Sequence, residues 1–422
     1  MESNFEKHVQ ERAVLVGLNA DTFTKAQTAT EETLEELDAL LETAGGFCTG
    51  KFLQNRHAPD AHSFIGEGKA LEVRMLVEAT ESTMVIFDNE LSPGHIRALE
   101  EMLGVTVLDR SALILDIFAQ RAKTKEGRLQ VELAQYKYLL PRLSGMGKSL
   151  SRQGGGIGTR GPGETKLESD RRHIRERIAR LQAELEQVRH VRAVQRERRM
   201  KNSVPVVAIV GYTNAGKSTL LNKLTDAGIP ANNRLFDTLD TTSRQLRVSD
   251  NLDVVLSDTV GFIAKLPHHL VDAFRATLEE LEYADLLLHV IDSADPNREE
   301  HIEVVEKLIS KLAKPGTKTL RCYNKADLVS AEDIPIGEDV VRLSAKTGMG
   351  TDELLKAIEN ALGHSRHHVV LTLPYAMGGM VDTLHSSAQV MATEYTAEGI
   401  EIEAILDPIL YGKLKDYITK EC

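Results

Sequence analysis

The stretch GYTNAGKS, from Gly211 to Ser218, has the residue types and spacing of a phosphate-binding loop, because it fits the pattern G-x-x-x-x-G-K-[ST]. It follows the apolar run VPVVAIV and precedes the helical pattern STLLNKL. Glycines let the backbone curl so that its N–H groups face phosphate oxygens at a helix N-terminus. Lys217 adds positive charge at the terminal phosphates. The residues that we predict to contact nucleotide here are Gly211, Asn214, Ala215, Gly216, Lys217, Ser218 and Thr219.

A second motif, DTVG, follows the predicted strand LDVVLSD. An aspartate at a strand end, Asp258, suits a magnesium ion, and the N–H of Gly261 can meet a γ-phosphate. The preceding loop, LFDTLDTTSR, should supply a threonine that closes over the metal. By position we favour Thr238 over the other two threonines of that loop. The predicted Mg²⁺ ligands are Ser218, Thr238 and Asp258.

Base selection is predicted from NKAD, residues 324–327, at the end of another predicted strand. An aspartate carboxylate accepts two hydrogen bonds from the N1 and 2-amino edge of guanine, a pair that adenine cannot donate. SAK, residues 344–346, follows the next strand and can support the base. In this order the motifs resemble the GTPase series, so they predict GTP rather than ATP. The base-binding residues are Asn324, Lys325, Asp327, Ser344, Ala345 and Lys346.

The residue after Gly261 is Phe262. In Ras-like GTPases a glutamine there orients the attacking water, and phenylalanine cannot do so. We therefore expect slow intrinsic hydrolysis that a partner or an ion completes. Asn214 is a candidate ligand for K⁺ near the phosphates, with tolerance of the loop's turn geometry as the alternative. The residues predicted to act in hydrolysis are Lys217, Thr238, Gly261 and Asn214.

The elements that must position these motifs follow from hydrophobic periodicity. Over residues 1–110 short apolar runs alternate with amphipathic helices, which predicts an α/β domain with a largely parallel sheet. Ser92, Pro93 and Gly104 are predicted to start and stop one of the helices. The predicted strands are 13–20, 83–88 and 105–109, and the predicted helices are 30–45, 68–79 and 92–104.

Residues 111–202 carry a different pattern. A long helical run from Ser111 ends in leucines and a tyrosine spaced 4, 3, 4, 3, from Leu129 to Leu143, and a later helix repeats this spacing from Ile174 to Val188. That narrow apolar seam is typical of a coiled-coil pair. We predict an antiparallel helical hairpin with the glycine-rich stretch 153–168 at its tip; the alternative is that each helix packs on a different domain.

Residues 203–363 again alternate strands and helices and hold the nucleotide motifs, so they are predicted to form a P-loop α/β domain. Residues 364–422 read as a small α+β domain with a strand, a short helix, a hairpin and a final helix reaching Cys422. The five strands predicted for the P-loop domain are 204–210, 252–258, 285–292, 320–324 and 339–345.

Charge is distributed unevenly along the 422 residues. Net charge is −12, yet residues 136–202 hold 17 Lys and Arg against 7 Asp and Glu, a net of +10 that leaves −22 for the rest. A composition of 42% hydrophobic and 27% charged residues is typical of globular proteins. Without a secretory pattern, a membrane-length apolar run or a Cys-x-x-Cys pair among the three cysteines, we expect a cytoplasmic location with reduced thiols.

Four stretches outside the common motifs carry a family resemblance. They are FIGEGKALE (64–72), DRSALILDIFAQRAKTKEGRLQVELAQ (109–135), GGIGTRGPGETKLE (155–168) and DTVGFIAKLPHHLVDAF (258–274). Over about residues 10–365 the chain resembles the HflX family of ribosome-associated GTPases, in the Obg-HflX group of translation-factor-related P-loop GTPases. Phenylalanine after the DxxG glycine is usual in that family.

The resemblance implies an N-terminal α/β domain, a two-helix arm that reaches rRNA, and a G domain. It also implies binding to the large ribosomal subunit, since related proteins separate stalled ribosomes into subunits. We expect no DNA partner, at most peripheral membrane association, and a monomer.

The glycine-rich tip is then expected to approach RNA phosphates. It has no preceding strand and no GK[ST], so it is not a second P-loop; the alternative is a flexible, solvated linker. FIGEGKALE also lacks the full pattern, so a turn that opens a helix is favoured over a second nucleotide site. The predicted rRNA-binding residues are Arg152, Arg160, Lys166, Arg171 and Arg172.

Three functions remain open at this point. The first is a GTPase coupled to the large ribosomal subunit that dissociates stalled ribosomes. The second is an rRNA-binding factor gated by nucleotide, in which hydrolysis is incidental; Phe262 keeps it open. The third is a role in ribosome assembly.

Overall fold

The computed structural model covers the chain and describes most of it. Among the described residues no helix is long and apolar enough to cross a membrane. The chain divides into two compact units. The described ranges are 10–25, 27–143, 162–201, 204–225, 235–236, 242–249, 252–265, 280–363, 367–406 and 408–421.

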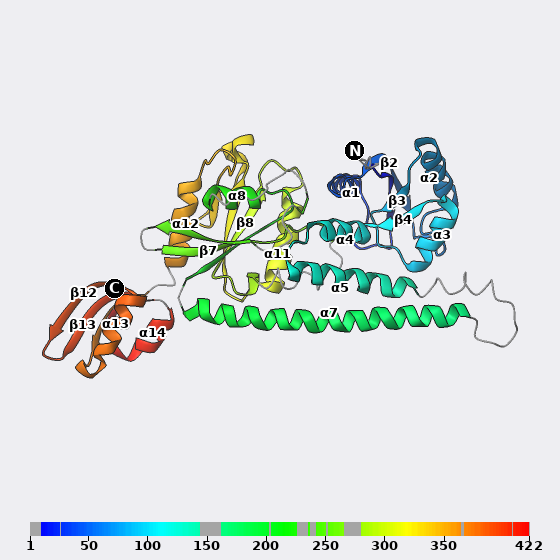
Figure 1. Ribbon diagram of the computed structural model, residues 1–422. Coiled ribbons are helices and arrows are strands. Elements are labelled where there is room, and N and C mark those ends of the chain that lie inside the picture. The colour runs from blue at the N-terminus through cyan, green and yellow to red at the C-terminus, as the bar shows by residue number, and fades with distance from the viewer. Residues whose placement is uncertain are drawn as a thin grey trace, which may run out of the picture. The chain divides into compact units, whose positions relative to one another are not determined.

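The N-terminal sheet has four parallel strands in the order β2-β1-β3-β4. Helix α1 packs with α4, and α2 packs with α3 (Figure 1). The chain's direction across the sheet reverses between β1 and β3, which is where doubly wound sheets form a crevice at the strands' carboxyl ends. The elements are β1 (Arg12–Ala20), α1 (Glu31–Ala44), β2 (Phe47–Arg56), α2 (Glu67–Thr80), β3 (Met84–Phe87), α3 (Pro93–Leu103) and β4 (Thr106–Asp109).

Local sequence accounts for most of these boundaries. Helix α3 begins with the Ser92 side chain accepting from the His95 N–H and with Pro93 in its first turn, and it ends at Gly104 with φ +72°, as predicted. Gly66 stands at the N-cap of α2, so FIGEGKALE does open a helix. Strand β2 was not predicted, because its residues are mostly half-buried and form no apolar run.

The arm is built from α4 (Arg110–Arg121), α5 (Lys125–Arg142) and α7 (Pro162–Lys201). The single helical run predicted from Ser111 is two helices, because Thr124 caps a new helix by accepting from the Gly127 N–H. Helices α5 and α7 run side by side (Figure 1), with an ion pair between Arg177 and Glu132. The two predicted seams meet in one apolar cluster of Leu129, Leu133, Tyr136, Ile178, Leu181 and Leu185.

The second sheet has six strands in the order β10-β9-β8-β5-β7-β6. All neighbours are parallel except β6, which pairs antiparallel with β7. Strand β6 was not predicted, since its sequence TSRQLRVS is largely polar. The elements are β5 (Val206–Gly211), α8 (Lys217–Thr225), β6 (Thr242–Ser249), β7 (Leu252–Asp258), β8 (Leu286–Asp292), α11 (Arg298–Leu312), β9 (Lys318–Asn324), β10 (Val340–Arg342) and α12 (Thr351–Gly363).

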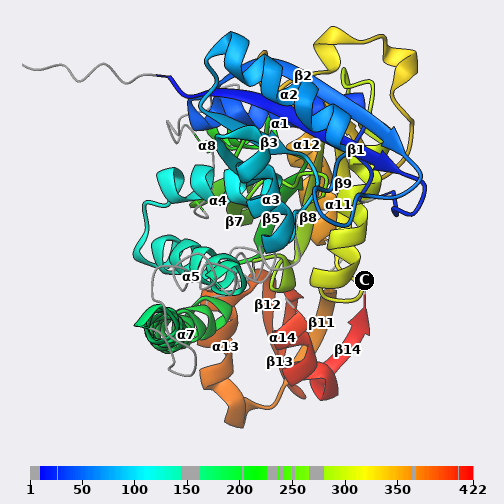
Figure 2. The same ribbon diagram turned by 90° about the vertical axis from the view of Figure 1, so that its right-hand side faces the viewer.

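The C-terminal sheet is antiparallel, in the order β12-β13-β11-β14, and is drawn in orange and red in Figure 2. The helix predicted to reach Cys422 ends at Leu414, and the chain then forms β14 against β11. The apolar residues Ile418 and Leu371 pair there, so tertiary pairing overrides the helical pattern. The elements are β11 (His367–Leu373), α13 (Gly378–Ser387), β12 (Gln389–Thr396), β13 (Gly399–Leu406), α14 (Pro408–Leu414) and β14 (Ile418–Glu421).

A buried histidine in β8 makes the fold sensitive to acid. His289 is 1% exposed, and burial, with smaller contributions from Arg321 and Lys217, lowers its pKa from 6.5 to about 4. The unfolded chain therefore binds a proton between these pH values that the folded chain does not.

We predict that the free energy of unfolding falls as pH drops from 6.5 towards 4, by on the order of 3 kcal/mol from this residue. His289→Gln should flatten that part of the pH profile, measured as the urea midpoint at several pH values. An identical acid slope in the variant would show that other groups cause it.

Candidate functional site

The predicted phosphate loop connects the end of β5 to the start of α8. Gly211 has φ +157°, and a Cβ there would lie 2.3 Å from the Val290 carbonyl oxygen. Gly216 has φ +95°, and a Cβ there would lie 2.2 Å from the Asn324 side-chain nitrogen. Both glycines are therefore required by the backbone's curl and by its close neighbours.

Lys217 is buried beneath this loop, with 7% of its surface exposed. Its Nζ donates to the Tyr212 carbonyl oxygen at 2.7 Å. Burial lowers the lysine pKa to about 8, an effect that the Asp258 carboxylate partly opposes. The loop thus holds a positive charge at its centre that an anionic ligand would favour.

Ser218 and Asp258 meet at the carboxyl edge of the sheet. Ser218 Oγ donates to Asp258 Oδ2 at 2.9 Å, and Asp258 is fully buried. The next residue, Thr259, donates from Oγ1 to the Ile209 carbonyl oxygen at 2.7 Å and so fixes the motif to β5. A hydroxyl and a carboxylate are hard oxygen donors, which fits Mg²⁺. The predicted third ligand, Thr238, lies outside the described residues.

Asn324 connects the base-binding motif to the phosphate loop. Its Nδ2 donates to the Ala215 carbonyl oxygen at 2.7 Å, and its Oδ1 accepts from the Ala345 N–H at 2.9 Å. Both bonds are buried. One side chain therefore ties together three motifs, of which the phosphate-loop residue lies 109 positions before Asn324 and the SAK residue 21 positions after it.

The other residues predicted to bind the base or the phosphates lie near the ends of their strands, in turns, loops or the first turn of a helix. Lys325 has φ +59° and its Nζ lies 2.5 Å from Asp292 Oδ2. Asp327 is in the 3₁₀ turn Ala326–Leu328, Ser344 Oγ accepts from the Thr347 N–H at 3.3 Å, and Lys346 is exposed. Thr219 is half-buried in the first turn of α8.

The two residues tied to hydrolysis differ in environment. Asn214 is exposed with φ +61°, a conformation that asparagine adopts more readily than most residues. Turn geometry therefore explains the residue by itself, and its amide oxygen is also accessible to a cation. Phe262 is 2% exposed, so its ring packs inside the protein and orders no water.

The segment that continues the DTVG motif, residues 261–265, belongs to the same compact unit as the N-terminal sheet and arm. Lys265 Nζ binds Asp88 Oδ2, just beyond the carboxyl end of β3, and lies 3.2 Å from Thr33 Oγ1. The Arg110 guanidinium donates to Asp88 Oδ1 at 2.7 Å and pairs with Glu36. Burial lowers the Lys265 pKa, and Asp88 partly opposes this.

Two further contacts extend this arrangement. Arg110 Nη2 donates to the Ala264 carbonyl oxygen at 3.4 Å. The Phe236 ring, in the loop before β6, meets Phe118 of α4 edge to face, with centroids 4.7 Å apart. Both loops expected to respond to nucleotide therefore contact the N-terminal part of the chain.

Sequence reasoning missed this cluster. The available signal was that Asp88 and Asp109-Arg110 directly follow buried strands β3 and β4, where side chains of a parallel sheet converge. Lys265 lies within the stretch 258–274 that carries the family resemblance, but no role was predicted for it. A charged partner 177 residues away cannot be identified from one sequence.

The predicted RNA-binding residues are placed only in part. Arg152 and Arg160 lie outside the described residues, and Lys166 is in α7 with its side chain outside them. Arg171 is half-buried, and Arg172 is exposed and lies 4.0 Å from Glu176 on the same helix. Helix α7 carries these two arginines near the end that joins the glycine-rich stretch.

Comparison with known proteins places the whole chain among related GTPases. Residues 31–119 match a family described as GTP-binding GTPase N-terminal, residues 121–199 its middle region, and residues 206–325 a family described as 50S ribosome-binding GTPase.

The chain is 48% identical to the GTPase HflX of Caldanaerobacter subterraneus over 410 residues, covering 97% of this chain and 94% of that protein. It is 44% identical to GTPase HflX of Lacrimispora saccharolytica, covering 97% of each, and 46% identical to that of Escherichia coli, covering 86% of each. A GTP-binding protein from Sulfolobus solfataricus in complex with GDP superposes more loosely, with 26% identity, a TM-score of 0.45, and coverage of 83% of this chain and 98% of that one.

Asn324→Ala should destabilise the site, because it leaves the buried Ala215 carbonyl and Ala345 N–H without their partner. We expect a loss of about 2–4 kcal/mol in unfolding free energy and weaker GDP binding. Urea denaturation and titration with a fluorescent GDP analogue measure these. Asn55→Ala, at an exposed asparagine of β2, is the control. Wild-type affinity in Asn324→Ala would contradict the assignment.

Replacing Asp88 and replacing Lys265 should have unequal effects on the stability of the Asp88 cluster. Asp88→Asn leaves Arg110 and Lys265 buried without their shared carboxylate, a loss of about 3–5 kcal/mol, whereas Lys265→Met leaves Asp88 paired with Arg110. Hydrogen exchange should therefore accelerate over residues 258–265 in both variants, and in α1 and α4 only in Asp88→Asn. Lys325→Met, which breaks the separate pair with Asp292, should leave residues 258–265 unchanged. Equal protection in Lys265→Met and the wild type would show that the lysine does not hold this segment.

Proposed function

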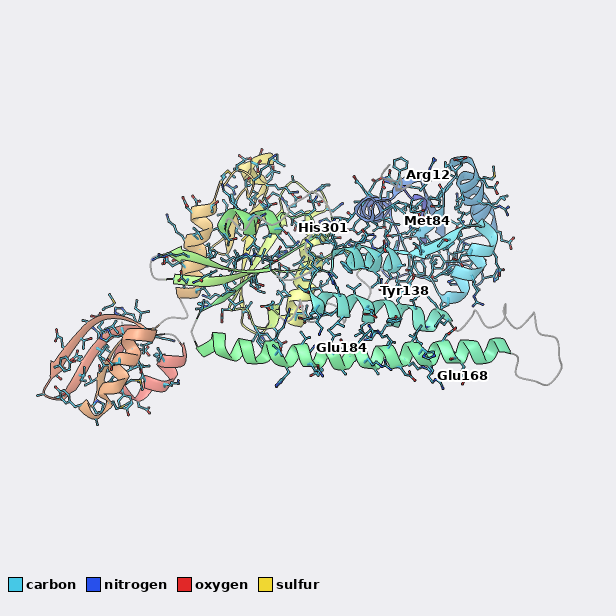
Figure 3. All side chains as sticks on the ribbon, viewed as in Figure 1. Arg12, Met84, Tyr138, Glu168, Glu184 and His301 are labelled. Carbon is cyan, nitrogen blue, oxygen red and sulfur yellow. The ribbon has the colours of Figure 1, made fainter. Side chains whose placement is uncertain are left out.

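The chain belongs to the HflX family of GTPases, and from that premise we propose that it binds the large ribosomal subunit and couples GTP binding and hydrolysis to the dissociation of stalled ribosomes. The observation that carries this proposal is the arm's attachment. Asp109, fully buried at the end of β4, accepts from Arg142 Nη2 at 2.9 Å and from the Tyr138 hydroxyl at 2.8 Å on α5 (Figure 3).

Asp109 thus binds the arm at the end of β4, and Asp88, which binds Lys265, follows the neighbouring strand β3. A force on the arm and a displacement of residues 261–265 would therefore act on neighbouring strand ends of one sheet. This arrangement supports a GTPase whose cycle responds to what the arm contacts.

In the proposed reaction GTP lies across the loops that Asn324 connects. Lys217 and the loop N–H groups would bind its phosphates and Asp327 would select guanine. Ser218, Thr238 and Asp258 would hold Mg²⁺, which would supply charge neutralisation at the phosphates. Phe262 offers no group for the attacking water. We therefore propose slow hydrolysis that the ribosome stimulates and that K⁺, bound at Asn214, assists.

The arm's positive charge supports an rRNA partner. Its net of +10 over residues 136–202 contrasts with −22 elsewhere, so RNA phosphates would attract the arm alone. We propose Arg152, Arg160, Lys166, Arg171 and Arg172 as contacts, a cytoplasmic monomer as the working form, and the division 1–110, 111–202, 203–363 and 364–422 for its domains.

One alternative has an observation in its favour. Because Phe262 is buried and cannot order water, GTP could act only as a gate for rRNA binding, in ribosome splitting or in assembly. Turnover in the presence of ribosomal subunits separates the two readings.

We predict that large ribosomal subunits raise GTP turnover at least tenfold in K⁺ buffer, and less in Na⁺ buffer. Phosphate release is measured with the protein alone, with large subunits and with small subunits. Arg171→Gln/Arg172→Gln should weaken subunit binding and reduce its salt dependence, with unstimulated turnover unchanged as the control. Tight binding without any rise in turnover would favour the gated RNA-binding factor, and a test with intact ribosomes then distinguishes splitting from assembly.

A further inference from the structure

An aromatic stack supports the phosphate loop from outside the nucleotide motifs. The ring of Tyr212, the second residue of the loop, lies against the imidazole of His301 with centroids 3.6 Å apart and planes 10° from parallel. His301 is in the first turn of α11 and is labelled in Figure 3. With the histidine against its ring, Tyr212 is 7% exposed.

A small pocket of about 10 Å³ lies beside this stack. Tyr212, Thr213, His289, Asp295 and His301 are among the residues that line it. Thr213 Oγ1 and His289 Nδ1 are buried and have no hydrogen-bond partner among the described residues. The packing here is therefore incomplete, and the stack is one of the contacts that support Tyr212.

A carboxylate in turn fixes the histidine. His301 Nδ1 lies 3.3 Å from Asp295 Oδ2, and the other Asp295 oxygen accepts from the Asn297 N–H at 2.8 Å. The neighbouring histidine lowers the Asp295 pKa, with the Asn297 N–H acting in the same direction. Asp295 is thus an ionised anchor between β8 and α11 that orients the imidazole ring.

The tyrosine's backbone leads to the phosphate-binding charge. Tyr212's carbonyl oxygen accepts from Lys217 Nζ at 2.7 Å. Gly211, directly before it, is the last residue of β5 and has φ +157°, which glycine adopts with the least strain. A displaced Tyr212 ring would rotate the carbonyl that holds the lysine.

We propose that Asp295, His301 and Tyr212 form a positioning relay that holds Lys217 in place for the nucleotide's phosphates. The proposal rests on the assignment of Lys217 to GTP made above. The relay sets nucleotide affinity, and it acts equally on GDP and GTP because it supports the loop rather than the γ-phosphate. His301 and Asp295 are positioning residues that touch no reacting atom.

The test compares His301→Ala, which removes the stack, with His301→Phe, which keeps an aromatic face. We expect His301→Ala to weaken binding of fluorescent GDP and GTP analogues about fivefold, in line with the strength of aromatic pairs. Turnover at saturating GTP should stay within about twofold, so KM changes and kcat does not. His301→Phe should restore most of the affinity, and Asp295→Asn should give a smaller loss.

The chain offers a matched control. His367 of β11 stacks on Tyr411 of α14 with centroids 3.7 Å apart, so His367→Ala removes an equivalent pair away from the loop. It should leave nucleotide affinity unchanged. Thermal unfolding of each variant separates a loosened loop from a loss of folding.

Three results would overturn the relay: unchanged affinity in His301→Ala, an equal loss in His301→Phe, or a fall in kcat with affinity intact. Lys217→Ala distinguishes this failure from failure of the site. Wild-type nucleotide affinity in Lys217→Ala would overturn the phosphate assignment itself. A loss of affinity in Lys217→Ala, combined with wild-type affinity in His301→Ala, would overturn the relay alone.

Discussion

Two buried aspartates at neighbouring strand ends organise the N-terminal part of this protein. Asp88 follows β3 and binds Arg110 and Lys265, while Asp109 ends β4, caps α4 and binds Arg142 of the arm. Neither side chain is exposed. Buried carboxylates are costly unless cations and hydrogen bonds satisfy them, so the positions of the arm and of residues 261–265 are both constrained by the same sheet.

The P-loop unit follows a different principle, since neutral hydrogen bonds dominate there. Asn324 bridges Ala215 and Ala345, Thr259 is fixed to Ile209, and the stack on His301 supports Tyr212. These contacts fix the loops in a geometry suited to phosphate and base before a ligand arrives. Such preorganisation reduces the ordering cost of binding. In the proposed site, the charges of Lys217 and Asp258 would act on the nucleotide's phosphates and on Mg²⁺.

Sequence patterns predicted the parts of the fold that local physics determines. Buried parallel strands such as β1 and β8 are continuous apolar runs, and α3 has its own start and stop residues. The nucleotide motifs were identifiable because each loop needs particular residues at fixed spacing. Edge strands β2 and β6 and the terminal β14 were missed, because pairing with a neighbour rather than their own composition makes them strands.

The site's supporting residues were unpredictable for a related reason. Asn324 was assigned to the base, and its hydrogen bonds to two other loops appear only once the sheet brings them together. Residues His301, Asp295, Asp88 and Lys265 belong to no spaced motif, and their partners are distant in sequence or on the other side of a turn. The residues of a nucleotide-binding motif are those expected to contact the ligand, whereas these residues position the motif.

The Asp88 cluster also has an internal asymmetry that suits a moving segment. Arg110 is 2% exposed and pairs with both Asp88 and Glu36, so removing it would take a cation from two carboxylates and leave Asp88 paired with Lys265. Lys265 is 9% exposed, and burial opposes its charge strongly enough to lower its pKa despite the adjacent carboxylate. If Lys265 leaves, it regains hydration and Asp88 keeps Arg110 and Thr33 as partners. The net cost of release is therefore small compared with that of breaking the arginine pair. The cluster thus combines a buried arginine–carboxylate pair with a lysine whose release costs less, a property that suits the proposed γ-phosphate-sensing role of the DTVG motif.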